Sequence, residues 1–169
     1  KKLLVIIVTY NAMPWIDRCL QSVIDSTIKS DIFLIDNGST DNTINHIKIT
    51  YPSIHTVCNN KNIGFGKANN LGIEYAIEKN YDFIYLLNQD AWVFENTFEK
   101  IIEQHTKNPE YGILSPLQLE ANNRRLDKNF SQNLSKWPFS RNILDLIIDR
   151  DVDRVVNVDF AMAAHWMIP

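Results

Sequence analysis

Carboxylate and amide side chains follow each of three apolar segments in the first ninety residues. The segments and the polar residues after them are Val5–Val8 before Thr9-Tyr10-Asn11, Ile32–Ile35 before Asp36-Asn37-Gly38-Ser39, and Phe83–Leu87 before Asn88-Gln89-Asp90. Buried strands that end on such residues are typical of open α/β sheets, because ligands bind outside the carboxyl ends of parallel strands. We therefore expect the three strand ends to form one ligand site.

The third of these ends offers a ligand for a metal ion. Asp90 follows an apolar strand pattern, and a carboxylate beside a sheet crevice can bind a hard divalent cation. Mg²⁺ and Mn²⁺ are often held by one or two carboxylates together with substrate phosphates. The alternative is that Asp90 only caps the turn after the strand, since Asp is common in turns.

The second end places Asp36 directly after a buried strand. A carboxylate there could accept hydrogen bonds from a nucleobase N–H or from ribose hydroxyls. The residues after it also suit a glycine turn followed by a helix that Ser39 or Thr40 caps, with Asp41 in its first turn. This second interpretation accounts for the turn, but it does not explain why an acid ends a buried strand.

An asparagine-rich stretch over residues 59–72 contains Gly64 and Gly66, which would let a ligand approach the backbone closely. A helix that starts near Gly66 offers free N–H groups and the positive end of its dipole, which suits a diphosphate. The stretch is not a P-loop, because it lacks the glycine spacing and the Ser or Thr after Lys67, and it does not match G-x-G-x-x-G. The alternative is an ordinary loop with a glycine turn.

The elements that must position these residues alternate between strand and helix. Apolar runs predict strands at 3–8, 32–35, 54–58, 82–88 and 112–115, and apolar residues at helical spacing predict helices around 16–24, 44–47, 68–76 and 98–105. This order predicts an α/β fold with a mostly parallel sheet and helices on both faces. Beyond it we expect a mobile loop at 120–136, a short helix at 143–148, and two closing strands at 155–160 and 164–168.

Composition excludes several classes of protein. The chain has 169 residues and a net charge of −3, from 17 basic and 20 acidic residues, which argues against binding through nucleic-acid phosphates. No apolar stretch is long enough for a transmembrane segment. Cys19 and Cys58 fall among apolar residues and are expected to be buried free thiols in a reducing compartment. The charged run 149–154 and the four histidines are not assigned as metal ligands.

The motifs together resemble the inverting glycosyltransferase family 2, and within it the bacterial rhamnosyltransferase-like branch. The segments that carry the resemblance are Val8–Asn11, Ile35–Asp41, Asn62–Gly72 and Leu87–Asp90. A weaker match is Val158–Pro169, where the family often has glycine in place of Ala163. The order of these segments and their places at strand ends make the combined signal specific.

The resemblance implies a Rossmann-like GT-A fold and a nucleotide-sugar donor, held with Mn²⁺ or Mg²⁺. It implies a single domain over residues 1–169, with a nucleotide-binding part at 1–118, the loop and short helix at 119–154, and closing strands at 155–169. The resemblance also implies that the base lies over Thr9, Tyr10 and Asn11, and that Asp36 hydrogen-bonds a pyrimidine. It implies that the nucleotide-sugar pocket is lined by Asn62, Gly64, Phe65, Gly66 and Asn70. It places Asn88 and Asp90 in the metal motif. Asp90 is the main metal ligand, because Asn88 stands where the family carries its first acid.

The reaction that the resemblance implies is a single displacement at the anomeric carbon, in which a carboxylate deprotonates the acceptor hydroxyl. The donor would be dTDP-rhamnose or a UDP-sugar, and the acceptor a saccharide or a lipid-linked saccharide. We expect the catalytic base beyond Pro169 and assign it to none of Asp149, Asp151 and Asp153. We expect a cytoplasmic protein and leave open a peripheral association of a longer enzyme with the inner face of the membrane.

Two other functions remain as alternatives. A sugar-nucleotide pyrophosphorylase should carry a glycine-rich loop with an arginine after its first strand, and residues 9–14 contain neither. A non-catalytic nucleotide-sugar-binding homologue stays open, because Asn88 and Ala163 depart from the family pattern.

Overall fold

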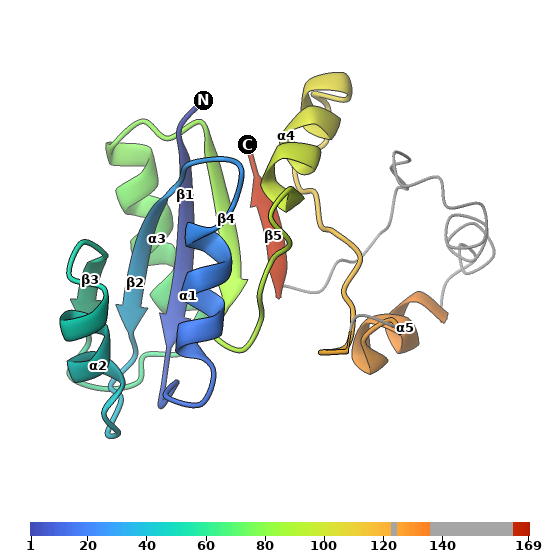
Figure 1. Cartoon of the computed structure of the whole chain (residues 1–169). Coiled ribbons are helices and arrows are strands. Elements are labelled where there is room, and N and C mark those ends of the chain that lie inside the picture. The colour runs from blue at the N-terminus through green and yellow to red at the C-terminus, as the bar shows by residue number, and fades with distance from the viewer. Residues whose placement is uncertain (123–124, 136–163) are drawn as a thin grey trace. The chain divides into compact units, whose positions relative to one another are not determined.

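The structure is a computed structural model that describes residues 1–122, 125–135 and 164–169 (Figure 1). Its elements in chain order are β1 Leu3–Thr9, α1 Ile16–Ile24, β2 Asp31–Asp36, α2 Thr43–Thr50, β3 His55–Cys58, α3 Phe65–Glu78, β4 Phe83–Asn88, α4 Thr97–Lys107, α5 Lys128–Ser135 and β5 His165–Ile168. They belong to two compact units. The first comprises Lys1–Leu114 and β5, and α5 lies in the second.

The first unit is built on a five-stranded sheet with the order β3-β2-β1-β4-β5. The pairs β1–β2, β1–β4 and β2–β3 are parallel, and β5 alone is antiparallel to β4. The predicted mostly parallel sheet is therefore confirmed. The chain builds β2 and β3 on one side of β1 and then crosses to β4 on the other side. The strand order reverses between β1 and β4, and in such sheets ligands bind outside the carboxyl ends of the strands at this point.

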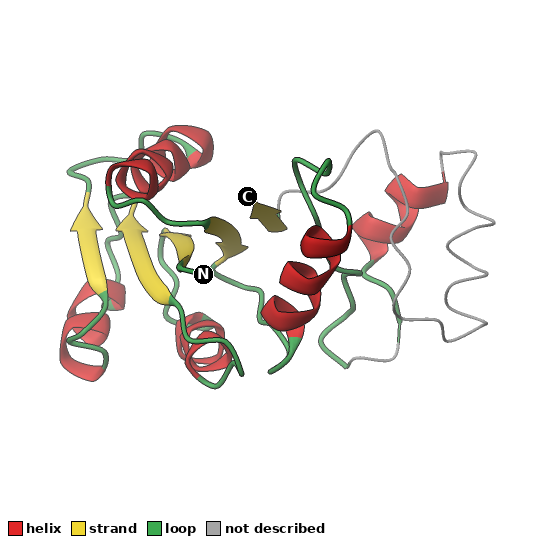
Figure 2. Cartoon of the chain, turned by 90° about the horizontal axis from the view of Figure 1, so that it is seen from above, coloured by secondary structure: helices red, strands yellow, loops and turns green. Residues whose placement is uncertain are grey.

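The centre of the sheet is apolar, because residues 3–8 of β1 are all apolar and buried. All seven residues of β1 are buried, as expected for a strand covered on both faces. Helix α3 lies on one side of the strands and α1 on the other (Figures 1 and 2). A Cβ on Gly72 of α3 would lie only 2.7 Å from the side chain of Ile6, so the glycine permits the helix to approach β1 closely. The core therefore holds the strand ends rigidly.

The predicted strand at 112–115 is wrong, whereas the closing strand predicted at 164–168 is confirmed as β5. Leu114 pairs with Met167 as an isolated bridge, with backbone N–H···O distances of 2.9 and 2.8 Å. Pro116 follows two residues later and has no N–H to donate, so the ladder cannot continue in this direction.

The predicted cap of α2 is also wrong, because the helix begins at Thr43 rather than after Ser39 or Thr40. The hydroxyl of Ser39 donates to Asp36 and accepts from the Asn11 N–H, so it is engaged outside the helix. Asp41 lies before the first turn, and its Oδ1 accepts from the Thr43 N–H at 3.0 Å. The segment 37–42 is therefore a structured loop and not a helix start.

The second unit contains a helix where a mobile loop was predicted. Helix α5 begins after Asp127, whose Oδ1 accepts from the backbone N–H of Phe130 at 2.9 Å, as a capping aspartate does. Phe130 is buried within this unit. The predicted helix at 143–148, the predicted strand at 155–160 and the charged run at 149–154 lie outside the described residues.

The two thiols differ from each other. Cys19 is buried as predicted, but Cys58 is exposed because it ends the edge strand β3. In the described part of the chain, every helix is too short or too polar to cross a membrane.

Candidate functional site

The parallel pairing of β1 with β2 sets Thr9 opposite Asp36, at the carboxyl edge of the sheet. Asp36 is 3% exposed, and both of its oxygens are engaged. Oδ1 accepts from the hydroxyls of Thr9, at 3.1 Å, and Ser39, and Oδ2 accepts from the N–H groups of Gly38 and Ser39 at 3.1 and 2.9 Å. A carboxylate has about four lone-pair positions, and these donors occupy them. Asp36 ends a buried strand because it holds the turn that follows.

Asn11 fastens the same turn from the end of β1. Its backbone adopts a φ of 53°, a left-handed conformation that asparagine tolerates. Its Oδ1 accepts from the N–H groups of Thr40 at 2.8 Å and Asp41 at 3.3 Å, and its own N–H donates to Ser39 Oγ at 2.9 Å. The loop after β1 and the loop after β2 are thereby joined.

Asn37 is a site residue that the sequence interpretation missed. It is 3% exposed, and its amide joins the loop after β2 to the loop after β3. Its Nδ2 donates to Asn62 Oδ1 at 2.9 Å, and its Oδ1 accepts from Asn59 Nδ2 at 3.3 Å and from the Ile63 N–H at 3.0 Å. The partners are 22 to 26 residues away, so no local pattern indicates them.

The predicted donor loop leads into the N-terminus of α3. Gly64 precedes the helix with a φ of 90°, a conformation that favours glycine, and its N–H donates to Asn62 Oδ1 at 2.9 Å. Phe65 is 44% exposed, and Gly66 and Asn70 are exposed as well. The first-turn N–H groups of a helix have no partners within the helix and suit an anion.

The end of β4 lies beside the end of β1, since Val8 pairs with Asn88. Gln89 extends this pairing: its Oε1 accepts from the Tyr10 N–H at 2.7 Å, and its Nε2 donates to the Tyr10 carbonyl at 3.2 Å. Gln89 is the second residue that the sequence interpretation left out. The Tyr10 side chain is 45% exposed. The structure therefore brings the ends of β1, β2 and β4 together, as the three sequence motifs predict.

Two side chains with oxygen atoms lie at the end of β4, Asn88 as its last residue and Asp90 two residues after it. Asn88 Oδ1 is buried and has no hydrogen-bond partner among the described residues. Asp90 is exposed, and its carboxylate makes no hydrogen bond or ion pair within the same part of the chain. Its charge adds to the effect of burial, which raises the pKa of the Cys19 thiol to about 12. An amide oxygen and a carboxylate two residues apart are the donors that Mg²⁺ or Mn²⁺ takes in proteins.

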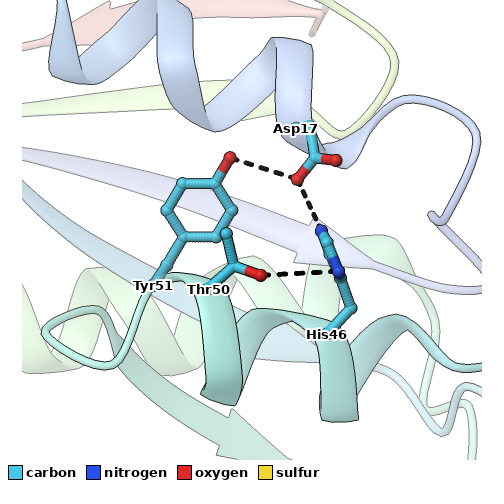
Figure 3. Close-up of polar contacts among 4 residues, drawn as sticks. All are labelled: Asp17, His46, Thr50 and Tyr51. Atoms are coloured by element: carbon cyan, nitrogen blue, oxygen red, sulfur yellow. Dashed lines mark hydrogen bonds and ion pairs between the residues drawn. The ribbon is translucent and has the colours of Figure 1, made fainter.

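A second polar cluster joins α1 to α2 and is separate from the strand ends (Figure 3). His46 Nε2 lies 2.6 Å from Asp17 Oδ1, and the Tyr51 hydroxyl donates to the same oxygen at 3.1 Å. The hydrogen bond with His46, followed by that from Tyr51, lowers the pKa of Asp17. Burial and the Asp17 hydrogen bond raise the pKa of Tyr51. The cluster is a link between two helices.

Comparison with protein families gives one match, in which residues 4–161 fit the model named Glycosyl transferase family 2. Two curated relatives are rhamnosyltransferases. The "dTDP-rhamnosyl transferase RfbG" of Shigella flexneri is 34% identical over 56% of this chain and 35% of its own length. The "N-acetylglucosaminyl-diphospho-decaprenol L-rhamnosyltransferase" of Mycobacterium tuberculosis is 28% identical over 67% of this chain and 40% of its own. The chain thus spans about two fifths or less of each.

Solved structures show the same fold. S. aureus TarS 1-349 in complex with UDP-GlcNAc has a TM-score of 0.63 at 19% identity, over 76% of this chain and 37% of that one. The mannosyltransferase PcManGT from Pyrobaculum calidifontis, in complex with GDP-Man and Mn²⁺, has a TM-score of 0.61 at 21% identity, over 69% and 35%. At these identities the likeness concerns the fold alone, and it confirms the predicted GT-A fold.

Proposed function

Because this chain belongs to glycosyl transferase family 2, we propose that it forms the donor-binding part of an inverting, metal-dependent glycosyltransferase. The observation that carries the proposal is the end of β4, where a buried amide oxygen of Asn88 and the exposed carboxylate of Asp90 lack protein partners among the described residues. Burying an oxygen without a partner costs about 1–3 kcal/mol, so a ligand that engages it compensates a standing penalty.

Each part of the site would bind a different part of the donor or its metal ion. Asp90, with Asn88, would hold Mn²⁺ or Mg²⁺, which supplies charge stabilisation for the departing diphosphate. The N–H groups at the start of α3, near Gly64 and Gly66, would bind phosphate oxygens. Asn62, Phe65 and Asn70 would line the pocket.

The nucleoside would lie over the ends of β1 and β2, against Thr9, Tyr10 and Asn11. Asp36 would contact the pyrimidine only if one of its present donors gave way, and the hydroxyls of Thr9 and Ser39 are the donors that can rotate. The contact of Asp36 with a pyrimidine stays a prediction. The observed role of Asp36 is to hold the turn after β2 through hydrogen bonds.

We propose dTDP-rhamnose as the donor, because two curated relatives are named as rhamnosyltransferases and one of them as a dTDP-rhamnosyl transferase. A UDP-sugar is the second candidate, since the structure of TarS holds UDP-GlcNAc. The acceptor would be a saccharide or a lipid-linked saccharide of a growing bacterial polysaccharide, in line with the decaprenol-linked name of one relative. Such an enzyme would act in the cytoplasm, at the inner face of the membrane where its acceptor is lipid-linked.

Calorimetry of dTDP and UDP, each with and without Mn²⁺, tests the proposal. We expect tighter binding with the metal, and we expect Asp90→Ala to remove that gain while Asn88→Ala reduces it less, because a carboxylate binds a cation more strongly than an amide does. Glu74→Ala, which removes an exposed acid within α3, is the matched control. Equal affinity with and without metal would contradict the metal role, and donor binding without sugar transfer by the full-length enzyme would favour a non-catalytic homologue.

A further inference from the structure

A groove runs between α1 and the segment that follows β4, on the side of the sheet opposite α3. Its volume is about 380 Å³, within the range of sites for small molecules. The residues that line it are Arg18, Gln21, Ser22, Asp25, Trp92, Val93, Phe94 and Glu95. None of them has a role in the donor site described above.

Hydrogen bonds fix the two walls of the groove to each other. The Val93 N–H donates to Ser22 Oγ at 3.2 Å near one end. Near the other end, Ser26 Oγ and the Thr27 N–H both donate to the Glu95 carbonyl, at 3.0 and 2.9 Å. The groove therefore has a shape of its own before any ligand binds.

At one end of the groove, an arginine side chain stacks on an aromatic ring. The guanidinium of Arg18 lies over the ring of Trp92, with its Cζ 3.4 Å from the ring centroid. Arg18 forms no ion pair with any of the described residues. A stacked guanidinium keeps its N–H donors in the plane of the group, where they remain available to an acceptor.

The other end presents acceptors. Asp25 and Glu95 line it, and Asp25 Oδ1 takes one hydrogen bond, from Gln21 Nε2 at 2.8 Å. Asp25, the C-cap residue of α1, lies seven residues after Arg18, which is ~10 Å along a helix. Phe94, 52% exposed, adds an apolar face to the lining. Donors, an aromatic face and acceptors thus follow one another along the groove.

We propose that this groove binds neutral saccharide units of the acceptor or product glycan. A hydroxyl group both donates and accepts, so a saccharide can accept from Arg18 and donate to Asp25 and Glu95, while its C–H face covers aromatic rings. An anionic ligand would meet the two carboxylates, and the same carboxylates disfavour an anionic membrane surface. That the saccharide belongs to the acceptor rests on the proposed function, whereas the chemistry of the groove does not.

Saturation-transfer NMR and affinity titration of the intact chain with short neutral oligosaccharides, containing rhamnose or N-acetylglucosamine, test the proposal. We expect Phe94→Ala and Arg18→Gln each to weaken oligosaccharide binding about tenfold, because each removes one of the contacts that define the groove. Both side chains are exposed, so the fold should survive. Trp15→Ala is the matched control, since Trp15 is 44% exposed, precedes α1 and does not line the groove.

Binding of dTDP and UDP is measured in the same variants and should not change. The proposal is wrong if no oligosaccharide binds the wild-type chain, if both variants bind like it, or if Phe94→Ala abolishes binding to phospholipid vesicles instead. Oligosaccharide binding by a chain that fails to bind nucleotides would contradict the proposed function and leave the groove assignment standing.

Discussion

The ends of β2 and β4 carry the same residue types at the same edge of one sheet. They differ in whether the polar side chains are hydrogen-bonded to neighbouring loops. At the end of β2, the carboxylate of Asp36 and the amide of Asn37 are buried, and each makes several hydrogen bonds to neighbouring loops. After β4, Asn88 Oδ1 is buried without a described partner and Asp90 is exposed. An acid or amide at a strand end is therefore structural in one case and available to a ligand in the other.

The difference follows from what each loop must do. The chain after β2 turns sharply at Gly38, with a φ of 86°, and packs against the backbone of Lys61. Buried N–H groups in such a turn need acceptors, and Asp36 supplies them. The chain after β4 is held by the side chain of Gln89, which leaves its two neighbours free of that task. A polar side chain at a strand end is therefore available to a ligand where another side chain makes the hydrogen bonds that the loop backbone needs.

The largest expected effect that separates the two regions is on stability. Asp36→Ala should lower the free energy of unfolding by about 3 kcal/mol, because several buried donors lose a charged acceptor. Asp90→Ala should change it by no more than about 0.5 kcal/mol, as for an exposed residue that has no hydrogen-bond partner among the described residues. Urea unfolding followed by tryptophan fluorescence measures both. Equal losses of unfolding free energy in the two variants would contradict the proposed difference between Asp36 and Asp90.

A matched pair of amides gives the next largest effect. Asn37→Ala should cost about 2 kcal/mol, because it leaves groups of Asn59, Asn62 and Ile63 without their partner. Asn88→Ala should cost little or even stabilise the protein, since it removes a buried oxygen that has no partner among the described residues. The same unfolding experiment decides. A large loss in Asn88→Ala would show that its oxygen is engaged by the protein.

Strand-end chemistry was predictable from sequence because it depends on local pattern. The apolar runs before Thr9, Asp36 and Asn88 identify the strands, and parallel pairing then brings their ends together. The distant partners of Asp36 and Asn37 were not predictable, because Thr9 and Asn62 lie 27 and 25 residues away from them. Residue type shows that a group is polar, and only the fold shows whether its hydrogen bonds are already made.

The errors in secondary structure have a similar origin. The bridge at Leu114 has strand-like residues but too few pairing groups before Pro116. Helix α5 was missed because its sequence is polar, although Asp127 followed by the buried Phe130 was a local capping signal. Ser39 or Thr40 was predicted to cap α2, and the Ser39 hydroxyl donates to Asp36 instead. A side chain with two competing partners cannot be assigned from its neighbours alone.

Two glycines sharpen the comparison at a smaller magnitude. Gly38→Ala should cost about 1–2 kcal/mol, because an alanine at a φ of 86° is strained and its Cβ would lie 3.1 Å from the Lys61 backbone. Gly66→Ala should be neutral or slightly stabilising, since its Cβ would meet nothing within 4 Å and it lies in the first turn of α3. Thermal unfolding of both variants tests this, and equal losses would mean that the turn after β2 is not specially constrained.

The smallest effect concerns Asp17, a carboxylate that is exposed like Asp90 but paired like Asp36. Its pKa is lowered, chiefly by the hydrogen bond with His46. A lowered pKa stabilises the fold above the unfolded value of about 3.9, and this contribution is lost as the pH falls through the folded value. Because the pair is exposed, its coupling should be only about 0.2–1 kcal/mol.

A double-mutant cycle of Asp17→Asn and His46→Gln measures that coupling from unfolding free energies near pH 5 and at a pH below the folded pKa of Asp17. The coupling should be present at the higher pH and vanish at the lower one, where Asp17 is protonated and the ion pair is gone. It should also weaken in high salt, because surface charges are screened. A coupling that grows on acidification would show that the protonated carboxyl is the preferred partner of His46. In that case, the hydrogen bonds and ion pairs that an acid makes within the protein would not account for the different roles of Asp17, Asp36 and Asp90.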